Sequence, residues 1–390
     1  MIGKVLYFLL RPGDRLAQKK IHVGLLFGGR SGEHEVSIAS ALSVYNALDK
    51  SRYDVTMIGI DKQGRWLLPD PVAMLAQARD PMHAKIKDSS QFVGLLPYSN
   101  PQQMVLVEGR EGRIPHVDVM LPILHGTYGE DGTMQGLLEL AQIPYAGSGV
   151  LGSAVGMDKD VARRLLKAAG IQTVPTICIR KNEYAADTRK IEQSITREFQ
   201  FPFFVKPANA GSSVGVHKVK ALEQLAPALR DAFQFDLKVL VEKGVAAREL
   251  ECAVLGNDSP KASVVGEIIP RHEFYSYEAK YLDENGCELV APAQDLEPAT
   301  AAKIREWAIL AFRTLECRGM ARVDFFLDKK SGELFLNEIN TIPGFTSVSM
   351  YPRMWEASGL AYSALLDELI RLALEIFDQR KALKTTYEQK

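Results

Sequence analysis

Two carboxylates and one amide near the C-terminus have the residue types and spacing of a divalent-cation site. They lie on two predicted strands, residues 321–327 and 333–340, which a short turn separates. Side chains alternate between the faces of a strand, so Glu338 and Asn340 share one face and Asp324 reaches them if the strands pair as a hairpin. Oxygen-only donors suit magnesium or manganese. The alternative is a solvated hairpin face without a ligand.

A lysine and a glycine-bounded loop form a second candidate element. Lys206 ends a predicted apolar strand, and the loop at residues 211–215 follows closely. Glycine lacks a Cβ, so such a loop lets backbone N–H groups approach phosphate oxygens, and the lysine adds positive charge. The chain contains no G-x-x-x-x-G-K-[ST] motif, so this is not a Walker loop. A phosphate clamp is favoured over an ordinary hairpin turn.

A strand at residues 239–242 ends in an acidic–basic pair, Glu242 and Lys243, before small residues. A strand end of this kind presents backbone N–H and C=O groups that suit the edge of a purine. Glu249, on the next predicted strand, is a candidate ligand for ribose hydroxyls. A surface salt bridge explains Glu249 equally well.

Two loops of the N-terminal half follow predicted strands. Glu35 lies at the start of a predicted helix after the glycine-rich residues 28–32, and His125 begins a second glycine-rich loop. Ligands bind at the carboxyl ends of strands in parallel sheets, so both side chains are expected in one crevice. An ammonium group suits Glu35, and simple helix capping is the alternative.

Residues 147–152 match G-x-G-x-x-G, but the context of a dinucleotide site is missing. No convincing strand leads into the motif, and the next helix is expected only near Asp158. An interdomain joint is therefore the preferred interpretation. Residues 277–281, of mixed aromatic and charged type, are either a solvated loop or a lid that orders over a substrate.

Composition excludes several classes of protein. The 390 residues carry a formal net charge of -1 without a long basic run, which argues against nucleic-acid binding. No stretch has the length of a membrane span. The four cysteines are scattered, without a C-x-x-C pair, so neither a zinc site nor a disulfide framework is indicated. A cytoplasmic location fits best.

The order of predicted elements separates two kinds of architecture. Residues 1–20 are an extension to which the sequence assigns no role. Strands and helices alternate over residues 21–145, which predicts an α/β domain with a parallel sheet. Residues 70–115 are weakly patterned and are expected to be an insertion or surface connection. Beyond this domain, strands with interspersed helices predict an α+β fold.

Many of these motifs together resemble one family. The resemblance is to the D-alanine–D-alanine ligases of the ATP-grasp superfamily, in their longer, A-type form, and it covers about residues 21–380. The motifs lie in the family's order, at residues 29–37, 125–132, 157–159, 205–207, 211–215, 277–281, 321–324 and 337–346.

The resemblance implies three domains: residues 21–145 for substrate, a central unit 146–245, and a C-terminal unit 246–390 with the metal site and lid, the last two clamping ATP. It implies ATP-dependent joining of two D-alanines through a D-alanyl phosphate, for peptidoglycan synthesis. It also implies two Mg²⁺ or Mn²⁺ ions, a monovalent cation and a homodimer. A D-alanine–D-lactate ligase or another carboxylate–amine ligase is the alternative.

The resemblance also implies roles for individual positions. The implied catalytic residues are Glu35, Ser212, Tyr281, Arg322 and Gly344. The implied substrate-binding residues are Glu35, Val36, His125, Lys280, Ser349 and Met350. The implied ATP-binding residues are Lys159, Lys206, Ser212, Ser213, Glu242, Lys243, Val245, Glu249, Lys280 and Asn337. The implied metal ligands are Asp324, Glu338 and Asn340.

Two positions bear on the second substrate. The family's D-lactate-using relatives carry a histidine in place of a lid tyrosine, so Tyr281 favours the dipeptide-forming type. Met350, where leucine or methionine is usual, leaves D-lactate use as a side activity open.

Overall fold

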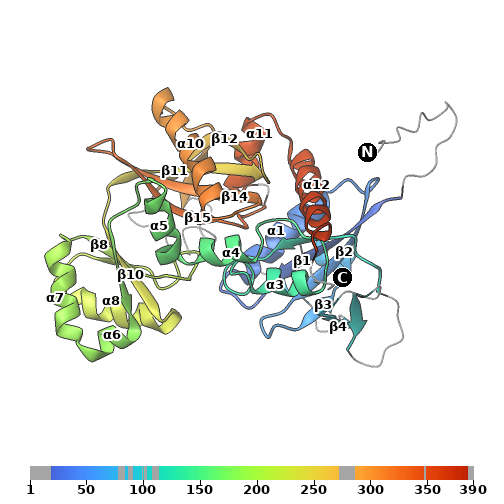
Figure 1. Ribbon diagram of the computed structural model, residues 1–390, viewed down its shortest axis with the longest axis horizontal. Coiled ribbons are helices and arrows are strands. Elements are labelled where there is room, and N and C mark those ends of the chain that lie inside the picture. The colour runs from blue at the N-terminus through green and yellow to red at the C-terminus, as the bar shows by residue number, and fades with distance from the viewer. Residues whose placement is uncertain are drawn as a thin grey trace, which may run out of the picture.

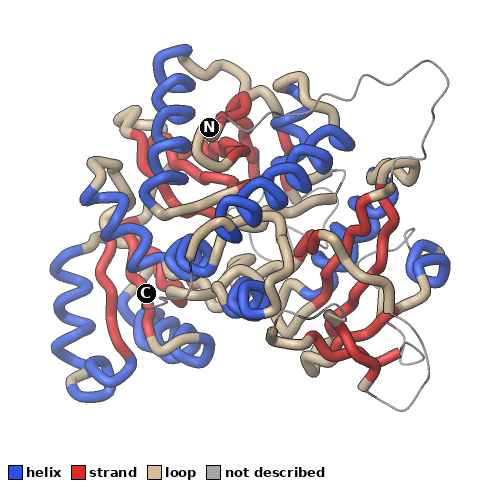
Figure 2. The backbone as a smooth tube through the Cα atoms, turned by 45° about the vertical axis from the view of Figure 1, so that its right-hand side comes forward, coloured by secondary structure: helices blue, strands red, loops and turns tan. Residues whose placement is uncertain are grey.

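The computed structural model describes residues 19–77, 84–86, 91–98, 100, 103–107, 114–271, 286–346 and 348–384. Its strands form three separate sheets, and helices lie against each of them (Figure 1, Figure 2). The predicted combination of α/β and α+β units is confirmed. In the described part of the chain, no helix combines the length and apolar composition that crossing a membrane requires.

The first sheet has the strand order β5-β4-β3-β2-β1-β6. Its parallel half consists of β1 (Ile21–Gly28), β2 (Tyr53–Ile60) and β6 (Val119–Ile123). These strands are apolar along most of their length because both faces are covered. The adjoining helices are α1 (His34–Ala47), α2 (Pro71–Leu75) and α3 (Thr133–Leu140).

The prediction of an insertion or surface connection at residues 70–115 is wrong for part of that range. β4 (Gln91–Leu95) and β5 (Met104–Leu106) join β3 (Trp66–Leu68) and extend the sheet with antiparallel strands. These strands are short and partly exposed at the sheet's edge, so their sequence shows little of the apolar alternation that marks a half-buried strand.

The second sheet is antiparallel, in the order β7-β10-β8-β9. The strands are β7 (Thr176–Arg180), β8 (Phe203–Pro207), β9 (His217–Val219) and β10 (Lys238–Lys243). The helices α6 (Lys181–Ala186), α7 (Thr188–Glu198) and α8 (Leu222–Phe235) accompany them. The buried side chains of this unit form a cluster of their own, drawn from residues 179–241.

The third sheet has the order β13-β12-β11-β14-β15. Its strands are β11 (Ala247–Gly256), β12 (Lys261–Pro270), β13 (Cys287–Val290), β14 (Gly319–Asp328) and β15 (Leu334–Asn340). The helices α10 (Pro298–Thr314), α11 (Met350–Ala357) and α12 (Tyr362–Lys381) pack around it. The buried side chains of α11 and α12 belong to the same hydrophobic cluster as those of β1 and α1. The first and third units therefore share a core.

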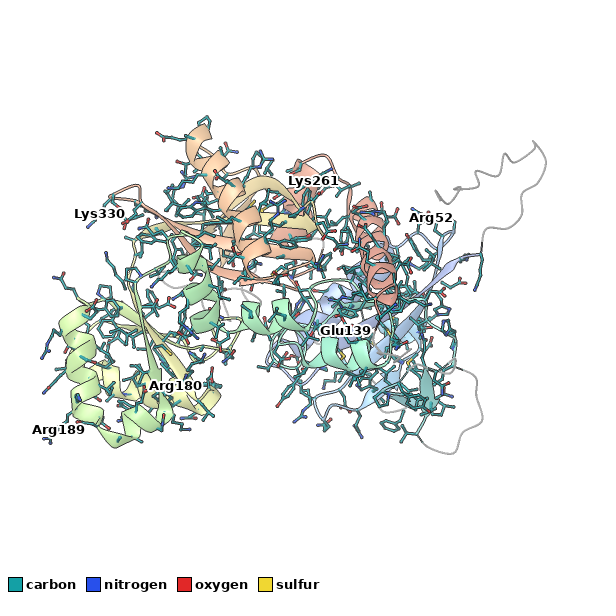
Figure 3. The ribbon with its side chains drawn as sticks, in the orientation of Figure 1. Arg52, Glu139, Arg180, Arg189, Lys261 and Lys330 are labelled. Atoms are coloured by element: carbon teal, nitrogen blue, oxygen red, sulfur yellow. The ribbon has the colours of Figure 1, made fainter. Side chains whose placement is uncertain are left out.

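Ion pairs at both ends of α12 reinforce the contact between the third and first units. Arg52, beside β2, pairs with Asp367 near the start of α12, and Arg380 near its end pairs with Glu139 of α3. Figure 3 labels Arg52 and Glu139 on the two sides of this helix.

Two helices connect the first sheet to the second. Figure 1 shows α4 (Val150–Met157) and α5 (Lys159–Ala168) between these sheets. The apolar side of α5 packs with the third sheet: Ala162 and Leu166 belong to the buried cluster that contains Val323 and Leu336. Helix α5 therefore falls within the predicted central domain, residues 146–245, but its apolar side chains pack in the core of the third sheet.

The prediction that no helix begins before Asp158 is wrong. α4 begins at Val150, directly after Gly149, inside the G-x-G-x-x-G pattern. A Cβ on Gly152 would lie 2.5 Å from the carbonyl oxygen of Glu316. This glycine permits close packing of α4 against the chain before β14, which explains the motif without a dinucleotide.

Candidate active site

The hairpin of β14 and β15 brings the three oxygen-donor side chains together. The strands pair with Asp324 opposite Glu338 and Arg322 opposite Asn340. The Nδ2 of Asn340 donates a hydrogen bond to Oδ2 of Asp324 at 3.0 Å. Figure 3 shows Lys330, in the hairpin turn, at the outer tip of the molecule, so the opposite end of the hairpin faces the interior.

Arg322 accompanies these side chains. Its Nε and Nη2 donate to the two carboxylate oxygens of Asp324, both at 2.7 Å, and Nε lies 3.1 Å from Oε1 of Glu251. Burial lowers the pKa of Arg322, but the carboxylates of Asp324 and Glu251 outweigh it and hold that pKa well above its usual value. The site therefore contains a permanent cation.

The donor set fits a hard divalent cation. It contains only two carboxylates, and within the described ranges no cluster of three or more His, Cys, Asp or Glu side chains has the arrangement of a metal site. Asp324 and Glu338 supply two carboxylates, and Asn340 adds an amide oxygen. Magnesium commonly takes one or two carboxylates and completes its shell with water and substrate phosphates. The three side chains thus match this ion's needs, and their role as ligands stays a prediction.

A cavity lies where all three units meet. The first unit contributes acidic, imidazole and apolar side chains to its wall, the second a glycine–serine loop, and the third the hairpin and the segment after it. The predicted site residues in the wall are Val36, His125, Lys159, Ser212, Arg322, Glu338, Asn340 and Gly344. Glu33 and Glu130 line it as well.

The carboxylate at the N-terminal end of α1 that lines the cavity is Glu33, whereas the predicted residue, Glu35, is not among the residues that line it. Glu33 lines the cavity, and its carboxylate accepts a hydrogen bond from Oγ of Ser212. The carboxylate of Glu35 lies 2.6 Å from Nζ of Lys62. Burial raises the pKa of Glu35, but the hydrogen bond and charge of Lys62 keep it below its usual value. Two residues along a helix turn the side chain through about 200°.

The loop that contains Ser212 has an unusual backbone. Ser212 and Ser213 have φ angles of 46° and 60°, in the left-handed region that non-glycine residues rarely adopt. Successive residues of this kind turn backbone N–H groups toward one concavity, which suits an anion. A Cβ on Gly211 would lie 2.5 Å from Oε2 of Glu33, so a larger residue here would displace the Glu33 carboxylate where the loop touches the first unit.

His125 is buried and holds the chain that follows β15. Its Nδ1 lies 3.0 Å from the carbonyl oxygen of Ile342, and its Nε2 lies 3.3 Å from Oγ of Ser40. Burial lowers the pKa of His125. Both ring nitrogens therefore have protein partners, one of them in the segment after β15, and the contact of His125 with a substrate stays a prediction.

Glu130 holds the same segment, although the sequence suggested no separate role for it. Its carboxylate accepts hydrogen bonds from the N–H groups of Gly126 at 2.7 Å and Ile342 at 3.0 Å. Burial, and then the charge of Glu33, raise the pKa of Glu130 to about 8. The sequence signal that could have indicated this role is the position of Glu130, an acidic residue in a glycine-rich loop that follows a strand.

The described lysines of the predicted nucleotide site lie on helix α5 and on strand β8 of the second sheet. Nζ of Lys159, the first residue of α5, donates to the carbonyl of Ala210 at 2.8 Å and lies 3.4 Å from Oε2 of Glu338. Nζ of Lys206 on β8 lies 2.7 Å from Oε1 of Glu242 on β10. Burial lowers the pKa of Lys206 to about 8, although Glu242 opposes the shift.

The remaining predicted nucleotide residues lie around the connection of the second sheet to the third. Lys243 ends β10, with its N–H bonded to the carbonyl of Pro175, and Val245 lies before β11. Glu249 is part of β11, and Asn337 of β15 accepts hydrogen bonds from Arg163.

Two of the predicted substrate-binding residues, Ser349 and Met350, follow the hairpin. Met350 is buried, with 4% of its surface exposed, in the core that includes Met354, and it is not among the residues that line the cavity; its assignment to the substrate site stays a prediction. Its Cε would lie 2.2 Å from a Cβ on Gly266 of β12. Ser349 precedes α11, and its Oγ accepts the N–H of Thr346 at 3.0 Å. Lys280 and Tyr281 lie outside the described residues.

Models of a known family match most of the chain. The model described as D-ala D-ala ligase N-terminus matches residues 22–148, and the one described as D-ala D-ala ligase C-terminus matches residues 165–371. With three sheets arranged around one cavity, these matches define the ATP-grasp class of architecture.

Individual relatives agree. D-alanine–D-alanine ligase A of Escherichia coli is 49% identical over 370 residues, which are 94% of this chain and 100% of the relative. The solved D-alanine–D-alanine ligase of Coxiella burnetii has a TM-score of 0.80 and 38% identity, covering 93% of this chain and 97% of its own. The VanG D-Ala:D-Ser ligase of Enterococcus faecalis has a TM-score of 0.78 and 35% identity, covering 91% and 100%. The chain belongs to the D-alanine–D-alanine ligase family.

Proposed function

We propose that the protein joins two D-alanines to D-alanyl-D-alanine at the expense of ATP, for peptidoglycan synthesis. The carboxylate of the first D-alanine attacks the γ-phosphate and forms a D-alanyl phosphate, with release of ADP. The amine of the second D-alanine then attacks the acyl carbon, and phosphate leaves. One observation carries the proposal. In this chain, which matches the family's models, Glu33, the permanently charged Arg322 and the oxygen-donor hairpin surround a single cavity.

The first D-alanine is assigned to the part of the cavity beside Glu33. An ammonium group is the natural partner of this carboxylate, and the nearby Arg322 guanidinium suits the substrate carboxylate and the oxyanion that develops from it. The N–H of Gly344 is the second donor to that oxyanion. This assignment is supported by the buried side chains of His125 and Glu130, which bond to the backbone of Ile342, two residues before Gly344, and so fix the position of this segment.

The triphosphate is assigned to the space between the second and third sheets. Lys159 and Lys206 supply positive charge, and the backbone of Ser212 and Ser213 supplies N–H groups. Asp324, Glu338 and Asn340 would hold the divalent cations, which neutralise phosphate charge during phosphoryl transfer. Magnesium is the proposed ion, with manganese as its substitute. A monovalent cation, a homodimer and a cytoplasmic location complete the proposal, the last supported by four free cysteines.

The proposed function is tested by supplying ATP and magnesium with D-alanine, alone or mixed with D-lactate or D-serine. We expect phosphate release that depends on D-alanine and yields D-alanyl-D-alanine as the main product from pH 7 to 9. D-serine is included because the similar VanG protein is named a D-Ala:D-Ser ligase. A mixed product that outweighs the dipeptide would refute the proposed second substrate, and ATP turnover without any D-alanine product would refute ligation.

The burial of Lys206 predicts that nucleotide affinity depends on pH. Because its pKa is lowered to about 8, the ammonium is lost as pH rises through that value, and with it one charged contact to a phosphate. We expect the dissociation constant of a non-hydrolysable ATP analogue to increase by about tenfold between pH 7 and pH 9.5. Calorimetry at constant magnesium measures it, with Lys206→Met as the control that lacks the pH dependence. A constant affinity over this range in the wild type would contradict the assignment.

A further inference from the structure

A buried arginine that no sequence motif indicated bridges the two sheets of the nucleotide site. Nη1 of Arg163 donates to Oγ1 of Thr176 at 2.6 Å and to Oε1 of Glu242 at 2.5 Å, both in the second sheet. Nη2 donates to the carbonyl oxygen and Oδ1 of Asn337, at 3.2 and 3.3 Å, in the third sheet. The planar guanidinium has a rigid geometry, so these contacts set the distance between the sheets at this point.

Arg163 also shares a carboxylate with the phosphate-site lysine. Oε1 of Glu242 lies 2.5 Å from the arginine and 2.7 Å from Nζ of Lys206, and at most 11% of each of these three side chains is exposed. Burial raises the pKa of Glu242, but Arg163 and Lys206 outweigh it and keep the pKa below its usual value. The carboxylate is therefore charged, and both cations hold it in place.

The position of Arg163 on its helix connects it to the other nucleotide-site lysine. Lys159 and Arg163 are four residues apart on α5, so they share one face of the helix. Lys159 reaches the carbonyl of Ala210 and the carboxylate of Glu338, while Arg163 reaches Glu242 and Asn337 one turn further on. Ala162 and Leu166, which follow Lys159 and Arg163 by three residues, lie beside them on the buried side of the helix and enter the core of the third sheet. One helix thus presents two cations to the second sheet from a firm support.

The second sheet needs such a connection because its hydrophobic core is separate. Its buried cluster is drawn from residues 179–241, whereas the first and third units share a core. Polar contacts join α5 to the second sheet: besides those of Arg163, Lys238 of β10 pairs with Asp158, which caps the helix, and with Asp160 in its first turn. Polar contacts of this kind determine the relative placement of two separately packed units.

We propose that Arg163 is a positioning residue for ATP, which fixes the second sheet against the third and holds Glu242 and Lys206 at the nucleotide. The proposal rests on the proposed function, since it assumes that ATP lies between these sheets. Arg163 acts through its neighbours and is not itself assigned a contact with ATP. Its loss therefore weakens ATP binding selectively and leaves the D-alanine site beside Glu33 unaffected.

Three variants test this role. Arg163→Met removes the bridge but leaves Glu242 paired with Lys206, so the buried carboxylate keeps a partner and the fold is expected to survive. Arg163→Lys keeps a charge beside Glu242, but a single ammonium cannot make all four contacts. The matched control is Arg164→Met: the neighbouring side chain is 66% exposed and pairs with Asp160 on the same helix.

We expect Arg163→Met to raise the KM for ATP, and the dissociation constant of ADP measured by calorimetry, by at least about tenfold. The KM for D-alanine should change by less than about twofold, as should every constant of the control, and Arg163→Lys should lie between wild type and Arg163→Met. ATP and ADP constants within twofold of wild type in Arg163→Met would overturn the proposal. Equal loss for ATP and D-alanine, or a lysine variant no better than methionine, would also overturn it.

If Arg163→Met does not fold, the lysine variant decides, because its KM for ATP must rise while its KM for D-alanine does not. A wild-type protein that binds ADP without forming the dipeptide would refute the proposed function and not the role of Arg163.

Discussion

Glu338→Gln is expected to lower ATP-dependent turnover by about 10³-fold or more while the fold survives. The change removes one negative charge from the oxygen-donor hairpin at constant shape. Glu338 pairs with Asp324 across the hairpin and lies 3.4 Å from Nζ of Lys159, so it serves both the predicted cation site and a predicted phosphate contact. Phosphoryl transfer depends on charge neutralisation at these oxygens, and a neutral amide does not supply the negative charge with which the carboxylate attracts the divalent cation.

Phosphate release with saturating D-alanine and varied magnesium measures this effect. Glu333→Gln is the matched control, because Glu333 is an exposed residue of the same hairpin whose carboxylate contacts Gln172. The control should retain its activity, and both variants should melt within about 3 °C of the wild type, as expected for changes of partly exposed side chains. Turnover of Glu338→Gln within tenfold of the wild type would refute the assignment of this residue to the metal.

Glu33→Gln is expected to raise the KM for the first D-alanine, and to lower kcat/KM, by about 100-fold or more. Its carboxylate lines the cavity and accepts a hydrogen bond from Ser212, so its loss removes both the proposed partner of the substrate ammonium and the link to the second unit. Glu35→Gln, two residues away, breaks only the partly exposed pair with Lys62 and should change kcat/KM by less than about threefold.

Initial rates with varied D-alanine at saturating ATP separate the two variants. A larger loss in Glu35→Gln than in Glu33→Gln would assign the ammonium site to Glu35 and contradict the assignment to Glu33. Equal and small effects in both would remove the ammonium site from this end of α1.

The hairpin site could be predicted because its geometry is local. Residues 324, 338 and 340 lie on two strands joined by a short turn, and the alternation of strand side chains places them on one face once the strands pair. The same reasoning found the lysine at the end of β8 and the loop after it. In each case the chemistry and the structure that positions it are separated by few residues.

The choice between Glu33 and Glu35 depended on a helix boundary, which sequence patterns locate poorly. α1 begins at His34, so Glu33 is the residue before the helix and faces the cavity, whereas Glu35 lies on the first turn and points to Lys62. The burial of Met350 could not be predicted for a related reason. It begins α11, and its side chain packs under β12, a contact between segments more than 80 residues apart.

Arg163 shows a different limit. In the sequence it is one of two consecutive arginines on a helix that reads as an exposed amphipathic segment. The structure buries Arg163 and leaves Arg164 exposed, because only the first faces Glu242, 79 residues further along the chain. A buried charge requires its partner, and that partner is known only once the sheets are placed.

The most direct test of the metal site is anomalous X-ray scattering from crystals grown with manganese and a non-hydrolysable ATP analogue. We predict manganese peaks bounded by the side-chain oxygens of Asp324, Glu338 and Asn340 on one side and by the triphosphate on the other, at about 2.0–2.3 Å from the ligating oxygens. Manganese bound elsewhere, with these three side chains directed away from the phosphates, would contradict the account.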